Sequence, residues 1–162
     1  MKLWSGAVFA AAALIASNAQ AAGIERQQAS GAMIASSATV PPGSTLIFLS
    51  GATASPINPA DTDSADAYGN TEVQTMSILT KMKAQLAAMG LTMGDVVKMT
   101  VFLVGDPRLG GKMDRDGMTV SFKKFFGTAD QPNLPTRSAF QIAGLARPQQ
   151  LVEIEAIAAK AP

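Results

Sequence analysis

Apolar residues recur every three or four positions between Thr71 and Met89, which is the period of an amphipathic helix. Thr71 and Gln74 have the spacing of a capping box and predict the start of the helix, and Gly90 predicts its end. A second, shorter pattern of this kind covers residues 119–126 and contains three phenylalanines. The apolar stripe of the first helix is expected to face a core; it consists of Val73, Met76, Leu79, Met82, Leu86 and Met89.

Strand-like segments surround these two helices. Two β-prone runs within residues 33–51 are interrupted by Pro41, Pro42 and Gly43, a combination that predicts a hairpin. Residues 96–104 are largely apolar, as in a central strand, and residues 136–143 and 151–159 alternate with a period of two. The order β-β-α-β-α-β-β predicts an α+β fold with one mixed sheet and two helices on one of its faces.

The last two strands carry charged residues in an otherwise apolar setting. Arg137 shares one strand face with Ala139 and Gln141, and Glu153 shares a face of the next strand with Glu155. We expect both charged faces to lie on the side of the sheet away from the helices. A guanidinium can bind a carboxylate through two parallel hydrogen bonds, and a nearby glutamate can accept a proton or orient water. The alternative is a structural ion pair between the two strands, which contributes about 0–1 kcal/mol when exposed.

The chain contains neither histidine nor cysteine, and this excludes several kinds of chemistry. Zinc sites built on these ligands, Ser-His-Asp triads, cysteine nucleophiles and imidazole bases are all unavailable. Two segments rich in Gly, Pro, Ser and Asp, residues 51–70 and 105–118, are predicted to be surface loops. Any catalysis must therefore use carboxylates, arginine or lysine, hydroxyls, backbone amides and water.

The N-terminus has the three parts of a secretory signal peptide. Lys2 precedes a short run of small and apolar residues, and Ala19-Gln20-Ala21 matches a cleavage site. We expect residues 1–21 to be a signal peptide and residues 22–162 a single domain, located in the periplasm or secreted. Loss of Lys2 would leave 12 basic and 12 acidic residues, so the mature chain would offer no basic surface for nucleic acid and no charge run for a membrane.

Several short motifs occur in an order that resembles the Rid family, the reactive intermediate deaminases of the RidA/YjgF type. They are Leu49-Ser50-Gly51, Gln74-Thr75, the run from Gly90 to Leu103, Phe125-Phe126, Pro135 to Ser138 and Val152 to Ala158. The resemblance covers nearly all of the chain after residue 30. It implies a chorismate-mutase-like fold that assembles as a homotrimer, with active sites in clefts between neighbouring subunits.

The resemblance also implies a reaction and the residues that perform it. The reaction is hydrolysis of 2-imino or 2-enamino acids to 2-keto acids and ammonia, with no metal or cofactor. Arg137 would hold the substrate carboxylate and Glu153 would position the attacking water, so both are candidate catalytic residues. Four further positions are candidates for substrate binding: Ser50, Gly51, Ala139 and Thr119.

The chain departs from the family pattern at three positions of the implied pocket. Ser37, Ala139 and Thr119 stand where family deaminases commonly carry a tyrosine, a cysteine and an asparagine. An alanine still supplies the backbone N–H that such a position can contribute. The departures keep a second function open, in which an exported trimer binds small carboxylates through Arg137 without converting them. A holdase-like role through exposed apolar surface and RNA cleavage have less support in the sequence.

Overall fold

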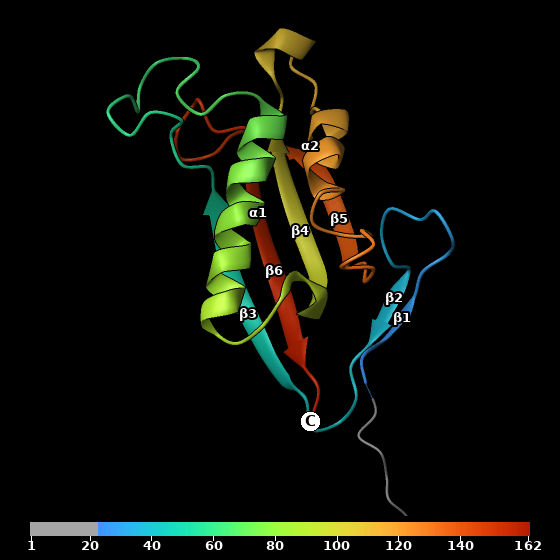
Figure 1. The fold of residues 1–162 in the computed structure, drawn as a ribbon. Coiled ribbons are helices and arrows are strands. Elements are labelled where there is room, and N and C mark those ends of the chain that lie inside the picture. Colours follow the sequence, from blue (N-terminus) through green and yellow to red (C-terminus); the bar gives the residue numbers. More distant parts are fainter. Residues whose placement is uncertain (1–22) are drawn as a thin grey trace, which may run out of the picture.

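The computed structural model describes residues 23–162, and the expected signal peptide lies outside the described residues. Two helices lie across one face of a four-stranded sheet, and a small two-stranded ribbon lies beside it (Figure 1). The α+β fold with two helices and a mixed sheet is thus confirmed. The elements are β1 (Glu25–Gln27), β2 (Ser37–Thr39), β3 (Thr45–Thr53), α1 (Thr71–Ala88), β4 (Val96–Val104), α2 (Arg115–Phe122), β5 (Thr136–Ile142) and β6 (Val152–Lys160), with short 3-10 helices at Met93–Asp95 and Pro107–Leu109.

The main sheet has the strand order β3-β6-β4-β5. Strand β6 pairs antiparallel with both β3 and β4, whereas β5 pairs parallel with β4 and forms one edge of the sheet. The parallel pairing requires a crossover, and α2 provides it by packing on the same face as α1 (Figure 1). Residues 96–104 form a central strand, as their apolar run predicts.

The hairpin predicted around Pro41 to Gly43 is wrong. Strand β2 pairs with β1 in the separate ribbon, and β3 pairs instead with β6 at the far end of the chain. The ribbon is attached to the main body through Arg26, whose Nη2 donates to the Gly94 carbonyl at 2.7 Å. A further bond runs from the Ala35 N–H to the Pro135 carbonyl at 3.0 Å, which brings β2 to the beginning of β5.

Helix α1 begins as predicted, although a different residue caps it. The Asn70 side chain accepts the Val73 N–H at 3.0 Å, so Asn70 is the N-cap. Gln74 is fully buried: its Nε2 donates to the carbonyls of Gly69 and Gln149, and its Oε1 accepts the Leu151 N–H at 2.8 Å. The predicted capping box is therefore wrong, and Gln74 instead joins α1 to the segment that leads into β6.

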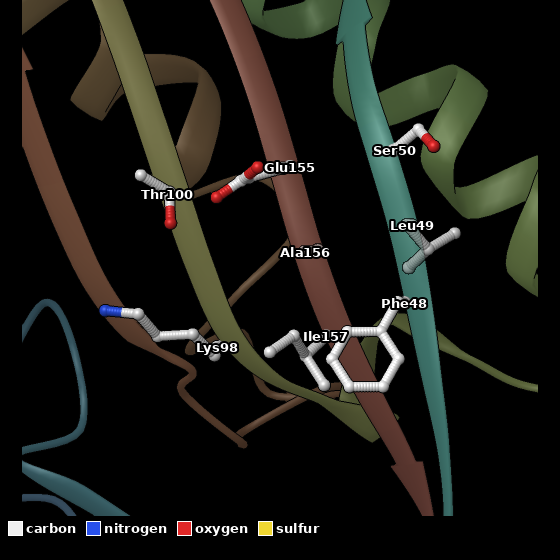
Figure 2. Close-up of a pocket in the computed structure, with 8 residues that line it drawn as sticks. All are labelled: Phe48, Leu49, Ser50, Lys98, Thr100, Glu155, Ala156 and Ile157. Carbon is white, nitrogen blue, oxygen red and sulfur yellow. The ribbon is translucent and has the colours of Figure 1, made fainter.

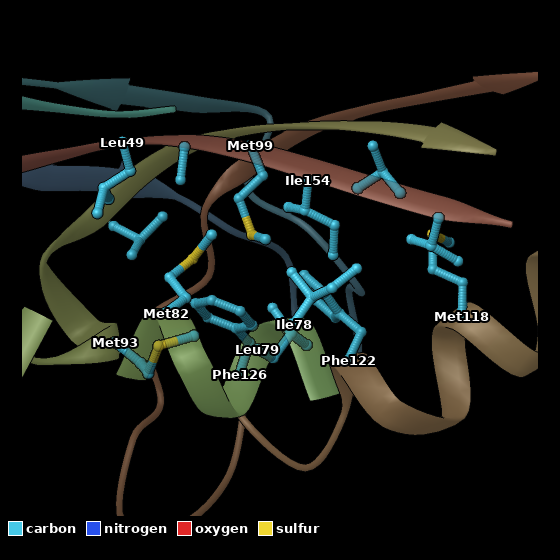
Figure 3. Close-up of a cluster of buried hydrophobic side chains, with 14 of the residues drawn as sticks. Leu49, Ile78, Leu79, Met82, Met93, Met99, Met118, Phe122, Phe126 and Ile154 are labelled. Carbon is cyan, nitrogen blue, oxygen red and sulfur yellow. The ribbon is translucent and has the colours of Figure 1, made fainter. Parts of the chain in front are cut away.

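The core fills the space between the helices and the sheet (Figure 3). Leu49, Met99 and Ile154 point from the sheet toward α1 and α2. Helix α2 begins at Arg115, four residues earlier than the predicted start, because Asp114 caps it by accepting the Gly117 N–H at 2.8 Å. Two predicted members of the α1 stripe are exposed, and the core side of that helix is formed by Thr71, Gln74, Thr75, Ile78, Leu79, Met82 and Leu86.

The opposite face of the sheet is not covered within the described chain. Phe48 on β3 is 72% exposed and Phe140 on β5 is 43% exposed, although both are large and apolar. Phe140 packs edge-on against Phe102, with ring centroids 5.2 Å apart. We call this surface the open face; it is formed by Leu46, Phe48, Lys98, Thr100, Phe102, Ser138, Phe140, Glu153, Glu155 and Ile157. None of the helices in residues 23–162 is long and apolar enough to cross a membrane.

Candidate functional site

Arg137 lies on the helix-covered face of the edge strand β5, not on the open face where the sequence pattern had placed it. It pairs in register with Met99, whose side chain is fully buried in the core. Partners in a parallel ladder point to the same side of a sheet. The Arg137 guanidinium accordingly stacks on the ring of Phe122 in α2, with 4.3 Å between its Cζ and the ring centroid.

The guanidinium of Arg137 has no anionic partner in the described chain. Its Nη1 is buried without a hydrogen-bond acceptor, and no carboxylate of residues 23–162 lies within ion-pair distance of it. Burial lowers the pKa of Arg137, and the positive charge of Arg115 lowers it further. An arginine still remains protonated at neutral pH. This half-buried cation can therefore bind a carboxylate from outside the described chain.

Two of the predicted binding residues lie in the same region as Arg137. Ala139 is two positions along β5, on the same face, and packs at the margin of the core. Thr119 lies one helical turn before Phe122 in α2, so the two side chains share a side of that helix. Further along β5, Gln141 accepts the Met113 N–H at 3.0 Å and holds the loop before α2 against the strand. We call Arg137, Ala139, Thr119 and Phe122 the arginine half-site.

The other three predicted residues meet at a bulge between β3 and β6. The register between these strands shifts after Leu49, and Ser50 and Gly51 occupy the irregular step. The side chain of Glu153 lies directly over Gly51, in the space that a Cβ atom would need. Glycine at this position leaves the space that the Glu153 carboxylate occupies. We call Ser50, Gly51 and Glu153 the glutamate half-site.

A shallow cavity of about 280 Å³ adjoins the glutamate half-site on the open face. Figure 2 shows Glu155 directed toward Thr100 across the neighbouring strands, with Phe48 beside Ile157. Ser50 lines one end of this cavity. At the other end, the Lys98 ammonium donates to the Ser138 hydroxyl at 3.0 Å. Both polar and apolar residues line the cavity, and the sequence pattern did not predict it.

The two half-sites do not meet within one chain. Arg137 pairs in register with Met99 of β4, and Glu153 pairs with Phe102 of the same strand. The two charged residues are therefore separated by about 10 Å along the strand direction and by about 10 Å across the sheet. They also lie on opposite faces of the sheet, because Glu153 belongs to the open face. The predicted common face is therefore wrong, and so is the alternative of an ion pair between Arg137 and Glu153 of one chain.

Sequence reasoning missed two residues beside Arg137. Phe122 was expected in the core but not as the platform for a guanidinium. Arg115 was assigned to a loop, whereas it is the first residue of α2 and close enough for its charge to affect Arg137. The spacing of residues 115, 119 and 122 is a helical repeat that could have indicated both. In residues 23–162, no cluster of acidic side chains has the arrangement of a metal site.

Known proteins resemble this chain across most of its length. The family model described as Endoribonuclease L-PSP matches residues 32–160. A RutC family protein of Haemophilus influenzae is 34% identical over 105 residues, which are 65% of this chain and 73% of that protein. The Escherichia coli protein named "Putative reactive intermediate deaminase TdcF" is 39% identical over 84 residues, or 51% of this chain, and the match spans only 57% of TdcF.

Solved structures show the same fold. The structure of E. coli TdcF with bound serine has a TM-score of 0.56 at 33% identity, covering 75% of this chain and 84% of TdcF. The E. coli YjgF gene product has a TM-score of 0.55 at 31% identity over 75% and 84% of the two chains. The shared fold agrees with the order of short motifs and with the extent of the matched family model. The chain therefore belongs to the Rid family.

Proposed function

We propose that the protein hydrolyses reactive 2-imino and 2-enamino acids to 2-keto acids and ammonia. The observation that supports this most directly is the Arg137 guanidinium, which is half-buried, stacked on Phe122 and without an anionic partner in residues 23–162. A 2-imino acid carries a carboxylate next to the reacting carbon. A bidentate arginine would bind this carboxylate and hold the C=N carbon at a defined distance.

We further propose that the working site is shared between two subunits of a homotrimer. Arg137 and Glu153 of one chain lie on opposite faces of the sheet and cannot touch one small molecule. Arg137 lies on the edge strand, so the open face of a neighbouring subunit can reach it. That face carries Phe48 and Phe140, which are exposed in one chain and would be buried by such packing. A closed assembly would join the arginine half-site of each subunit to the glutamate half-site of the next.

The proposed reaction begins with attack of water on the imine carbon. Glu153 takes a proton from the water as the new C–O bond forms, and the electron pair of the C=N bond moves to nitrogen. The proton then passes from Glu153 to the nitrogen of the carbinolamine. The C–N bond breaks as the carbonyl forms, Glu153 takes the hydroxyl proton, and this proton passes to the departing ammonia. Arg137 keeps the carboxylate in place throughout. An iminium acid and one water are thereby converted into a keto acid and an ammonium ion.

Similarity to TdcF supports this assignment. That protein is named as a reactive intermediate deaminase, and its solved structure holds serine, which is an amino acid with a carboxylate next to the reacting position. The description of the family model points instead to RNA cleavage. The described chain has no histidine for that chemistry and the whole sequence has a net charge of only +1, so no basic groove is expected for RNA. We therefore favour deamination.

The test measures keto-acid formation from 2-iminopropanoate, which an amino-acid oxidase releases from alanine. Arg137→Lys keeps the charge but loses the two-pronged hydrogen bonding, so we expect both binding and turnover to fall severely. Glu153→Gln keeps the size but loses the basicity, so we expect turnover to fall by about 100-fold or more while binding of pyruvate changes much less.

Three outcomes of this experiment lead to different conclusions about the function. Acceleration by the wild type, together with the two distinct losses, supports the deaminase. No acceleration over buffer, combined with Arg137-dependent binding of pyruvate in a calorimeter, would instead establish a carboxylate-binding protein. If both variants behave like the wild type in both assays, neither residue belongs to a site.

Gly51→Ala tests the glutamate half-site without altering a charged residue. The added methyl would occupy the position of the Glu153 carboxylate, so that side chain must move away. The obstructing atoms belong to the end of a flexible side chain, and we expect the melting temperature to change little while turnover falls nearly as far as in Glu153→Gln. Gly144→Ala is the matched control, because no atom lies within 4 Å of the added methyl. Normal turnover in Gly51→Ala would remove Glu153 from the mechanism.

We also propose that the protein acts outside the cytoplasmic membrane, on the strength of the signal-peptide pattern in residues 1–21. Mass spectrometry of the protein from an exporting host is expected to give a chain that starts at Ala22. A chain that retains Met1 in the cytosol would contradict this location.

A further inference from the structure

A second cation, Arg115, acts electrostatically on Arg137 of the arginine half-site, and the proposed reaction has no use for it. Residues 23–162 contain five arginines. Arg26 donates to backbone carbonyls, Arg108 forms ion pairs with Asp106 and Asp66, and Arg147 forms one with Asp63. Within the described chain, Arg115 and Arg137 are the two whose guanidinium groups contact neither a carboxylate nor a carbonyl. The charge of Arg115 also influences Arg137.

Helix α2 places Arg115 on the side that faces Arg137. Residues 115, 119 and 122 follow one another at intervals of four and three, so their side chains form a single stripe along the helix. Phe122 at the end of this stripe supports the Arg137 guanidinium. Arg115 at the other end is two turns away, about 10 Å along the helix axis. Thr119 lies between Arg115 and Phe122 along this stripe, where its hydroxyl can contact the middle of a bound ligand.

No acidic residue of the described chain forms an ion pair with Arg115. Asp114 precedes it in sequence, but the Asp114 carboxylate accepts the Gly117 N–H at 2.8 Å as the helix cap. The Coulombic neighbour that affects Arg137 is Arg115 and not an acid. The two like charges at opposite ends of this stripe repel each other, and a ligand with a single carboxylate pairs with only one of them. A ligand with two carboxylates would satisfy both.

We infer that the preferred substrates are 2-imino acids that carry a second carboxylate, such as the imines of aspartate and glutamate. This inference rests on the proposed function and specifies its substrate class. Arg137 binds the carboxylate beside the C=N carbon, Arg115 binds the distal carboxylate, and the Thr119 hydroxyl lies near the carbon atoms between them. A substrate with an uncharged side chain engages Arg137 alone.

The experiment compares Arg115→Gln with the wild type on two imines, those of aspartate and alanine, each released by an amino-acid oxidase. Charge-assisted hydrogen bonds of this kind change affinity by about 10- to 100-fold. We expect the ratio of kcat/KM for the dicarboxylic over the monocarboxylic imine to fall by that factor in Arg115→Gln. Lys112→Gln removes one positive charge from the exposed loop three residues away and serves as the control. Its ratio is expected to match the wild type.

A second measurement tests the two-arginine site by binding alone, independently of imine hydrolysis. Calorimetry compares binding of 2-oxoglutarate and 2-oxobutanoate, two stable keto acids that differ by the distal carboxylate. If the wild type hydrolyses both imines but Arg115→Gln leaves the ratio unchanged, the substrate class is wrong and the deaminase stands. If no imine is hydrolysed, the deaminase is wrong, and Arg115-dependent preference for 2-oxoglutarate still supports the two-arginine site. Equal affinity for both keto acids in the wild type would overturn it.

Discussion

Chains carrying Arg137→Ala and chains carrying Glu153→Gln are each expected to be inactive alone and to recover about one quarter of wild-type activity when a one-to-one mixture assembles at random into trimers. In the proposed trimer, each shared site would take its arginine from one subunit and its glutamate from the next. In a random one-to-one mixture, half of the sites receive an intact Arg137, and half of those receive an intact Glu153. The product of the two fractions is the expected recovery.

The measurement uses co-expression of the two variants with different affinity tags, followed by two purification steps that retain mixed assemblies. Mixed trimers alone contain one intact site in three, so their activity per trimer should exceed that of the random mixture. The control co-expresses wild type with the double variant Arg137→Ala/Glu153→Gln. A shared site predicts about one quarter of full activity for this random mixture, whereas a site within one chain predicts about one half. No recovery in the first mixture would place the site within a single chain.

Phe48→Lys is expected to convert the proposed trimer into monomers and to abolish imine hydrolysis at the same time. The Phe48 ring is 72% exposed on the open face, where the proposed assembly would bury it. Burying a phenylalanine contributes about 1.5–3 kcal/mol, and a trimer loses this contribution at each of its subunits. A lysine at the same place would also have to lose its hydration or leave the interface.

Light scattering measures the mass of the assembly, and circular dichroism checks that the monomer remains folded. Ile57→Lys is the matched control, because Ile57 is 64% exposed but lies in the loop between β3 and α1, away from the open face. That variant should remain trimeric and active. A wild-type protein that is monomeric at all micromolar concentrations would contradict the shared site directly. A trimeric, active Phe48→Lys would move the interface to another surface.

The sequence by itself determined the elements whose signals are local. The apolar repeat and Gly90 predicted helix α1 to within one residue of its observed end, and the apolar run of residues 96–104 predicted the full length of a central strand. Both depend on interactions between residues that are near one another along the chain. The order of motifs from Leu49 to Ala158 also indicated the family, which the matched family model confirms.

Tertiary structure decided the strand partners and the side of the sheet that each residue faces. A period of two separates the residues of β5 into two sets, but it does not say which set meets the helices. Phe140 suggested that its own set was the buried one, yet that ring lies on the open face and Arg137 points into the helix layer. The choice follows from the parallel register of β5 with Met99 in β4, which no local pattern encodes.

The same distinction applies to the candidate site. The sequence indicated which residue types were available, because a chain without histidine or cysteine must rely on arginine, carboxylates and water. It did not indicate that Arg137 and Glu153 lie on opposite faces, since their positions depend on two separate strand pairings with β4. Nor did it reveal that Arg115 begins a helix and faces Arg137. These are contacts between segments distant in sequence, which form only when the sheet and the helices pack together.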